Sequence, residues 1–254
     1  MRLHPSARVG FAAAATEYER GRPDYPVAAV EWLSAQLALG PEKTVLDLGA
    51  GTGKLTRALG SSGARIIALE PISEMATVIK HAAPQARVVT ATAEHTGIAS
   101  SSVDAATAGQ AFHWFANSEA LREIHRVLRP RGGLGLIWNR RDPRDPLWAE
   151  IDHLVEPLRL TEPAYRDHAW RPVLENSGLF STLVAETFIH RPSVTLDQLV
   201  DRVLSISYVA CRPKTDRELI AEQVAKLGQS YSGFEDGRVI LPYSTEAWVA
   251  FAID

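Results

Sequence analysis

Short apolar runs alternate with amphipathic segments from residue 26 to residue 140. The apolar runs are five or six residues long, which is typical of buried strands, and the segments between them mostly place apolar residues at helical spacing. This pattern favours an α/β fold, in which right-handed crossovers give a parallel sheet with helices on both faces. The predicted strands are residues 44–48, 65–69, 87–91, 103–108 and 134–138, and the predicted helices are residues 27–39, 53–59, 73–81 and 117–128.

Before the last predicted strand of this region, residues 130–133 are predicted to form a turn. The pattern changes after residue 140. Residues 142–178 show mostly helical patterns interrupted by prolines. Further helices are predicted at 195–209 and 216–229, and further strands at 180–190, 238–241 and 247–253. We expect a single domain, residues 1–254, built on a Rossmann-like, mostly parallel seven-stranded sheet. Residues 26–140 would form a cofactor-binding core. Residues 142–240 would form a mainly helical lid over the strand tips, where open α/β sheets bind ligands.

Composition narrows the partners of such a domain. A hydrophobic content of 46% and a charged content of 22% are ordinary for a globular protein, and no apolar run is long enough to span a membrane. The apolar stretch at residues 9–15 is too short for a signal peptide, so we expect a cytoplasmic protein. The net charge of −3 gives no general attraction to nucleic acid, and the single Cys211 and the scattered histidines predict no metal site. A small-molecule partner is therefore expected.

The most informative motif follows the first predicted strand. It reads Asp47-Leu48-Gly49-Ala50-Gly51-Thr52-Gly53, and Glu70 ends the second predicted strand seventeen residues after Gly53. Glycines let the backbone approach a ligand closely, and a carboxylate at the second strand tip can accept hydrogen bonds from ribose hydroxyls. A dinucleotide fingerprint needs a third glycine where this chain has Lys54. The motif resembles motif I of class I S-adenosylmethionine-dependent methyltransferases.

The charge at the motif agrees with this resemblance. A dinucleotide brings a pyrophosphate, which favours a positive helix N-terminus, whereas S-adenosylmethionine has no phosphate and carries an ammonium and a sulfonium. Asp47 suits the ammonium, directly or through water, and would repel a phosphate. A tight turn without a ligand is the alternative interpretation of the same glycines.

The resemblance extends over residues 11–140 and is weak thereafter, apart from residues 138–142 and 241–246. The middle of the chain looks like the methyltransferase-11 type of class I enzyme, and the N-terminal stretch is similar to the small-molecule branch that includes trans-aconitate methyltransferases. Two positions depart from the family pattern: Arg131 replaces a turn glycine, and Thr92 replaces an aspartate that often reaches the adenine. The segments that carry the likeness are 91–94, 102–104, 109–115, 123–130 and Phe11…Tyr18…Arg22-Pro23-Asp24-Tyr25-Pro26.

The resemblance implies a site for S-adenosylmethionine. Asp47 would lie near its ammonium, Tyr18 and Arg22 would close over its carboxylate, and Glu70 would hold the ribose. Arg22 could instead be a solvated surface cation, and Met75 could be core packing. The remaining residues of the implied site are Gly49, Ala50 and Gly51 under the methionine part, Pro71 and Met75 against the adenine, Ala93 and Glu94 at the adenine edge, and Gln110 beside the methionine moiety.

The segment after the fourth predicted strand, Phe112-His113-Trp114, is the candidate substrate region. His113 could act as a general base at neutral pH, or it could be an orienting or structural residue. Phe112 and Trp114 could line a substrate pocket or pack in the core. Enzymes that methylate nucleobase amino groups commonly place Pro-Pro-Tyr or Pro-Pro-Phe here, and this chain has no proline at that place.

The sequence thus predicts a methyltransferase that acts on a small-molecule acceptor, preferably on oxygen and otherwise on nitrogen or carbon. Two alternatives remain open: a non-catalytic S-adenosylmethionine-binding protein, and an NAD-dependent oxidoreductase on a similar sheet. The absent third glycine and Asp47 oppose the oxidoreductase.

Overall fold

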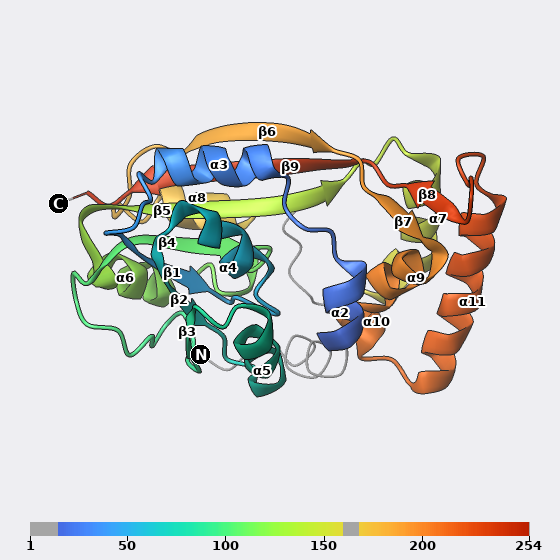
Figure 1. Ribbon diagram of the computed structural model, residues 1–254, viewed down its shortest axis with the longest axis horizontal. Helices are drawn as coiled ribbons and strands as arrows, with labels where there is room; N and C mark the ends of the chain where they lie inside the picture. Colours follow the sequence, from blue (N-terminus) through green and yellow to red (C-terminus); the bar gives the residue numbers. More distant parts are fainter. Residues whose placement is uncertain (1–14, 160–167, 254) are drawn as a thin grey trace.

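The computed structural model describes residues 15–159 and 168–253 and shows an α/β fold (Figure 1). Seven strands form one sheet in the order β3-β2-β1-β4-β5-β9-β6, in which β9 runs antiparallel to β5 and β6 and the other pairs are parallel. The predicted Rossmann-like fold is therefore confirmed. The strands are β1 (Thr44–Leu48), β2 (Arg65–Leu69), β3 (Arg87–Val89), β4 (Val103–Gly109), β5 (Leu128–Arg141), β6 (Val184–His190) and β9 (Tyr243–Phe251).

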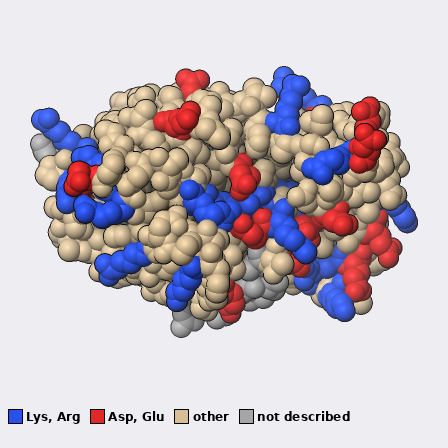
Figure 2. Space-filling model, in the orientation of Figure 1, with Lys and Arg blue, Asp and Glu red and all other residues tan. Residues whose placement is uncertain are grey.

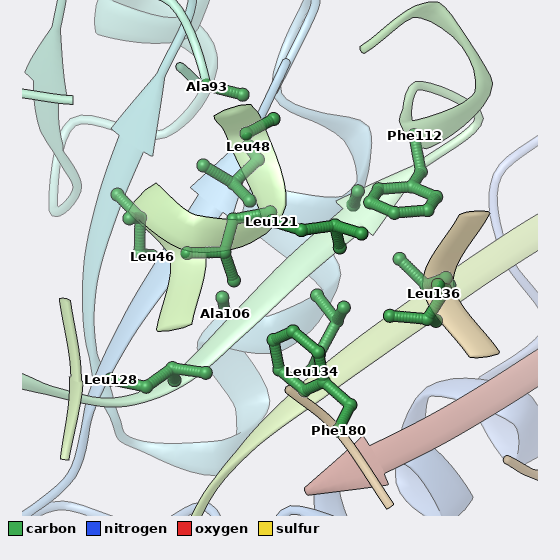
Figure 3. Packing of buried hydrophobic residues seen from close by; sticks show 14 of the residues in the cluster. Leu46, Leu48, Ala93, Ala106, Phe112, Leu121, Leu128, Leu134, Leu136 and Phe180 are labelled. Carbon is green, nitrogen blue, oxygen red and sulfur yellow. The ribbon is translucent and has the colours of Figure 1, made fainter. Parts of the chain in front are cut away.

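Helices cover both faces of this sheet. Alternation along β1 sends Val45 and Asp47 to one face and Leu46 and Leu48 to the other. On the second face Leu46 and Leu121 pack in the main core, part of which is shown in Figure 3. The helices on the first face are α3 (Val27–Gln36), α4 (Lys54–Leu59) and α5 (Ser73–Ala82), and those on the second are α6 (Ser118–Val127) and α8 (Trp170–Glu175).

The chain reverses its direction across the sheet between β1 and β4, which are neighbours although two strands separate them in sequence. At such a switch point the loops that leave the two strand tips diverge and leave room for a ligand. The glycine turn after β1 and the residues after β4 therefore face the same opening.

A second apolar core lies beside this opening, formed by helices that follow β5 and β6 (Figure 1). Its centre includes Trp148, Leu199 and Val224. We call these helices and a short strand pair the lid. The lid consists of α7 (Pro146–Val155), α9 (Leu196–Leu204), α10 (Ser207–Ala210), α11 (Lys214–Ser230) and the pair β7 (Ser193–Thr195) and β8 (Arg238–Ile240). Within residues 142–240, β6 and α8 instead belong to the main sheet and its covering layer.

Three local predictions differ from the structure. The expected turn at residues 130–133 is an irregular part of β5, where the register to β4 shifts and Arg131 takes a left-handed φ of 61°. The expected helix 195–209 is divided into α9 and α10 at residues 205–206. The final strand begins at Tyr243, because Tyr243, Thr245 and Ala247 alternate inward although polar residues separate them.

An unpredicted helix, α2 (Ala15–Gly21), joins the sheet domain to the lid. Arg20 pairs with Asp201 of α9 at 2.9 Å, and Glu19 pairs with Arg57 of α4 at 2.7 Å. Gly21 lies against the α9 backbone so closely that a Cβ there would be 2.2 Å from the Arg202 nitrogen. Phe11 and residues 9–14 of the apolar stretch at 9–15 lie outside the described residues.

We expect Gly21→Ala to lower the free energy of unfolding by about 1–3 kcal/mol, because the added methyl group must push α2 away from the α9 backbone. Urea denaturation followed by circular dichroism measures this. Gly40→Ala is the matched control, since a Cβ at Gly40 meets no atom within 4 Å. Equal stability of the two variants would show that α2 does not dock as described.

Candidate functional site

The turn between β1 and α4 is built from three glycines with positive φ: Gly49 at 60°, Gly51 at 61° and Gly53 at 87°. A Cβ at Gly49 would lie 2.9 Å from the Cβ of Ala111, and at Gly51 it would meet only the sulfur of Met75, at 3.9 Å. The turn therefore needs glycine for its conformation, and at Gly51 it leaves open space that a side chain would fill.

Glu70 fastens this turn to the tip of β2. Its two carboxylate oxygens accept hydrogen bonds from the backbone N–H groups of Gly51 and Ile72, each at 2.8 Å. The side chain is almost fully buried, and burial raises the pKa of Glu70 to about 7. Each carboxylate oxygen has a further lone pair for a ligand hydroxyl.

Asp47 lies at the tip of β1, on the face covered by α4. The Thr56 and Thr107 hydroxyl groups donate to its two oxygens at 2.6 and 3.1 Å. Burial raises the pKa of Asp47 to about 6, although both hydrogen bonds oppose this shift. The two hydrogen bonds thus hold the carboxylate in one orientation and partly compensate the cost of burying its charge, with no ligand required.

Two adjoining pockets, of about 540 and 470 Å³, meet at these strand tips. They share four lining residues (Tyr18, Gly49, Gly109 and Gln110), so we treat them as one elongated cavity. The first end is also lined by Gly51, Glu70, Pro71, Ile72, Met75, Trp114 and Phe115, and the second, beside the lid, by Arg22, Asp47, Ala50, Lys54, Asn139 and Arg202.

Arg22 reaches the second end from the segment after α2. Its Nε and Nη2 donate to the side chain and the carbonyl of Ser205, both at 3.1 Å, and its guanidinium lies 4.8 Å from the Tyr18 ring centre. Burial and the nearby Arg202 lower the pKa of Arg22 to about 10. Arg22 is thus a positioned cation at the cavity and not a solvated surface residue.

Gln110 and Asn139 complete the tips of β4 and β5. Gln110 has a left-handed φ of 60°, and its side-chain amide donates to the Asn139 carbonyl at 3.2 Å. The Asn139 amide donates to the carbonyls of Pro23 and Asp24, so β5 holds the N-terminal segment over the cavity. Sequence reasoning noted residues 138–142 as part of the resemblance but gave Asn139, Ile72 and Phe115 no role.

Comparison with known proteins identifies the family. A model of the methyltransferase domain matches residues 46–136. An uncharacterized methyltransferase of Mycobacterium tuberculosis is 37% identical over 238 residues, which cover 93% of each chain. An uncharacterized methyltransferase-like protein of Schizosaccharomyces pombe is 30% identical over 240 residues, covering 94% of this chain and 93% of the other. The chain belongs to the class I methyltransferase family.

Solved structures agree on the fold of this methyltransferase. A protein of Anabaena variabilis, provisionally assigned as a methyltransferase of an antibiotic biosynthesis pathway, superposes with a TM-score of 0.65 at 20% identity and covers 90% of this chain and 98% of its own. A protein of Anaeromyxobacter dehalogenans, provisionally assigned as a type II methyltransferase, gives a TM-score of 0.63 at 24% identity and covers 91% of this chain and 97% of its own. The branch that includes trans-aconitate methyltransferases stays an expectation.

Three of the predicted site residues, Phe112, Ala93 and Glu94, are not among the residues that line the cavity. Phe112 is fully buried in the main core, edge-to-face with Trp170, which is the packing alternative. Ala93 packs in the same core, and the Glu94 carboxylate accepts from the Asn117 side chain at 3.1 Å. Trp114 does line the cavity. Because neither Ala93 nor Glu94 lines the cavity, their role at the edge of the adenine stays a prediction.

His113 lies on the turn after β4, and its surroundings favour the neutral form of the imidazole. Burial and the charge of Arg22 lower the pKa of His113 to about 3. The indole N–H of Trp138 points at its Nδ1 at 3.4 Å. Since an indole nitrogen only donates, Nδ1 is the unprotonated nitrogen. An imidazole of such low pKa is a weak base, so this geometry supports a hydrogen-bonding role over proton removal.

Within the described ranges, no group of three or more histidine, cysteine or acidic side chains could hold a metal ion. Over the same residues, no helix is both long enough and apolar enough to cross a bilayer.

The raised pKa of Glu70 predicts a pH dependence of stability. The folded chain binds this proton more tightly than the unfolded chain, so the free energy of unfolding should fall as pH rises from about 4.5 to about 7, by about 3 kcal/mol from Glu70. Urea titrations over this pH range measure the free energy of unfolding, and in Glu70→Gln the part of its decrease that comes from Glu70 should be absent. The exposed Glu31→Gln control should show the same decrease as wild type. Parallel pH profiles of wild type and Glu70→Gln would contradict the assignment.

The state of His113 can be measured directly. We expect its imidazole to stay neutral, with the proton on Nε2, down to about pH 5, because burial disfavours the charged form. Nitrogen-15 NMR of histidine-labelled protein reports both the tautomer and the titration, and His113→Asn assigns the signal. A His113 titration midpoint between pH 6 and 7 would contradict the partly buried, neutral imidazole and restore the general base.

Proposed function

We propose that this methyltransferase transfers the methyl group of S-adenosylmethionine to an oxygen atom of a small-molecule acceptor. The observation that carries the proposal is the acidic character of the cavity at the glycine turn. Asp47 and Glu70 stand at the tips of the first two strands, and the one lysine beside the turn, Lys54, is paired with Asp24 at 2.9 Å. Two buried carboxylates suit a ligand with an ammonium and a ribose and repel a pyrophosphate.

The residues of the cavity fit each part of S-adenosylmethionine. Glu70 would accept from the ribose hydroxyls, and the apolar surface around Met75 would pack against the adenine. Asp47 would attract the ammonium, and Arg22 would bind the carboxylate through charge-assisted hydrogen bonds. The space above Gly51, which a Cβ would fill, supports close approach of the ligand to the turn.

When bound, the cofactor supplies a methyl group on a positively charged sulfur. The chain has to align the acceptor with that group and exclude water. Gln110 and Asn139, fixed at the tips of β4 and β5, and the lid would provide the alignment. The neutral His113 would contribute a hydrogen bond, and an acceptor that is already ionised needs no base.

The acceptor is proposed to be a metabolite and not a nucleic acid. The net charge of −3 gives no general attraction to a phosphate backbone. The tip of β4 has Gln110 followed by Ala111 and Phe112 in place of the proline-rich segment that is common where nucleobase amino groups are methylated.

Calorimetry tests the cofactor directly. We expect wild type to bind S-adenosylhomocysteine and not NAD. Glu70→Gln and Asp47→Asn should each lower the affinity for S-adenosylhomocysteine by about 10–100-fold, as expected for the loss of a hydrogen bond to a charged group. Glu31→Gln should bind as wild type does.

Turnover is then tested by incubating the chain with S-adenosylmethionine and candidate acids and phenols and measuring release of S-adenosylhomocysteine. Binding without release by any acceptor would support the non-catalytic alternative. NAD binding in place of S-adenosylhomocysteine would overturn the proposal.

A further inference from the structure

Arg22 and Arg202 line the lid end of the cavity, and Arg141 lies near the same Trp148 ring as Arg202. Arg141 pairs with Asp152 at 2.8 Å, whereas Arg22 and Arg202 form no ion pair with any described residue. Arg202 extends from α9 and is only 5% exposed. A buried guanidinium without a carboxylate is costly in a folded protein, so this arrangement calls for an anion that the described residues do not supply.

The hydrogen bonds of Arg202 leave part of its guanidinium unused. Its Nε donates to the Tyr243 hydroxyl at 3.2 Å, and the guanidinium carbon lies 5.9 Å from the Trp148 ring centre. The buried Nη1 has no hydrogen-bond partner in the described structure. Buried donors are nearly always satisfied in proteins, which makes this group a candidate for ligand binding.

Arg202 lies where an acceptor could enter. It lines the cavity together with Gln110 and Asn139. Its partner Tyr243 lines a surface groove of about 860 Å³ that shares Arg22, Pro23 and Lys54 with the cavity. Figure 2 shows charged side chains of both signs gathered in the middle of this face, where α2 lies between the two halves in Figure 1.

The other cations of the groove are already paired. Lys54 pairs with Asp24, Arg57 with Glu19 and Arg20 with Asp201. Within the described groove and cavity, the unpaired cations are therefore Arg22 and Arg202.

A count of charges separates these two residues, provided that the proposed function holds. The amino-acid end of S-adenosylmethionine brings one ammonium and one carboxylate, which Asp47 and Arg22 would bind. Arg202 then remains as a surplus buried cation. We propose that Arg202 binds a carboxylate of the methyl acceptor. A carboxylate carries the single negative charge that one guanidinium balances, whereas a phosphate dianion would leave negative charge beside Asp47.

The experiment uses wild type, Arg202→Met, Arg202→Lys and, as a control for net charge, the exposed Arg122→Met. Each protein is saturated with S-adenosylhomocysteine, and calorimetry then measures the affinity for succinate and benzoate and for the neutral analogues succinamide and benzamide. At least one carboxylate should bind wild type more tightly than its amide does. That affinity should fall at least about tenfold in Arg202→Met, fall less in Arg202→Lys, and stay unchanged in Arg122→Met.

The two possible sources of the carboxylate give different results. If Arg202 binds the acceptor, Arg202→Met should bind S-adenosylhomocysteine within about twofold of wild type, and Arg22→Met should bind it much more weakly. A loss of tenfold or more in Arg202→Met would place Arg202 on the cofactor carboxylate and overturn the proposal.

Further outcomes also decide. If wild type binds S-adenosylhomocysteine but no carboxylate binds better than its amide, the inference about Arg202 fails while the proposed function stands. If wild type does not bind S-adenosylhomocysteine, the proposed function itself fails. The melting temperature of unliganded Arg202→Met should equal or exceed that of wild type, because an unpaired buried charge is removed. A clear decrease would show that Arg202 is structural and would overturn the proposal.

Discussion

The pair of backbone hydrogen bonds accepted by Glu70 is the constraint on which the site depends. One bond holds Gly51 and the other holds Ile72, so a single carboxylate fixes the glycine turn and the start of the next loop relative to each other. Without it, the left-handed glycines could adopt many conformations, and the cavity floor would have no defined shape. The same carboxylate is buried at a cost, which its raised pKa records. Stability at this position is therefore given up for a preorganised binding surface.

The N-terminal segment completes the cavity by linking parts that are distant in sequence. Helix α2 is tied to α4 through Glu19 and to the lid through Arg20, and Asn139 of β5 holds the backbone of the segment that follows. Tyr18 and Arg22 are thereby carried to the lid end of the opening. The sheet supplies the two carboxylates of the site, and its unpaired cations come from the N-terminal segment (Arg22) and the lid (Arg202). This division matches a cofactor held by the sheet and an acceptor selected by the lid.

Much of this architecture is encoded locally and could be predicted. The strands β1 and β2, the glycine turn, Asp47 and Glu70 follow from short apolar runs and a motif of fixed spacing. The structure places Asp47, Glu70 and Arg22 at one cavity with the turn residues Gly49, Ala50 and Gly51. The rest depends on contacts between distant segments. Arg202 has no motif around it, and its significance arises only because the fold brings it to the cavity beside Arg22, where no described residue forms an ion pair with it. The low pKa of His113 likewise depends on burial and on Arg22, which local sequence does not reveal. The sequence predicts strand β9 only from residue 247 onward, because polar Thr245 is one of the inward residues of its first half.

The central claim is that the two strand-tip carboxylates receive the adenosyl group and the amino-acid end of S-adenosylmethionine. A crystal structure with S-adenosylhomocysteine bound tests it most directly. We expect ribose hydroxyl groups within hydrogen-bonding distance of Glu70, the ammonium on Asp47 directly or through one water, and the carboxylate on Arg22. A nucleoside bound elsewhere, with side chains packed over Gly49 and Gly51, would contradict it.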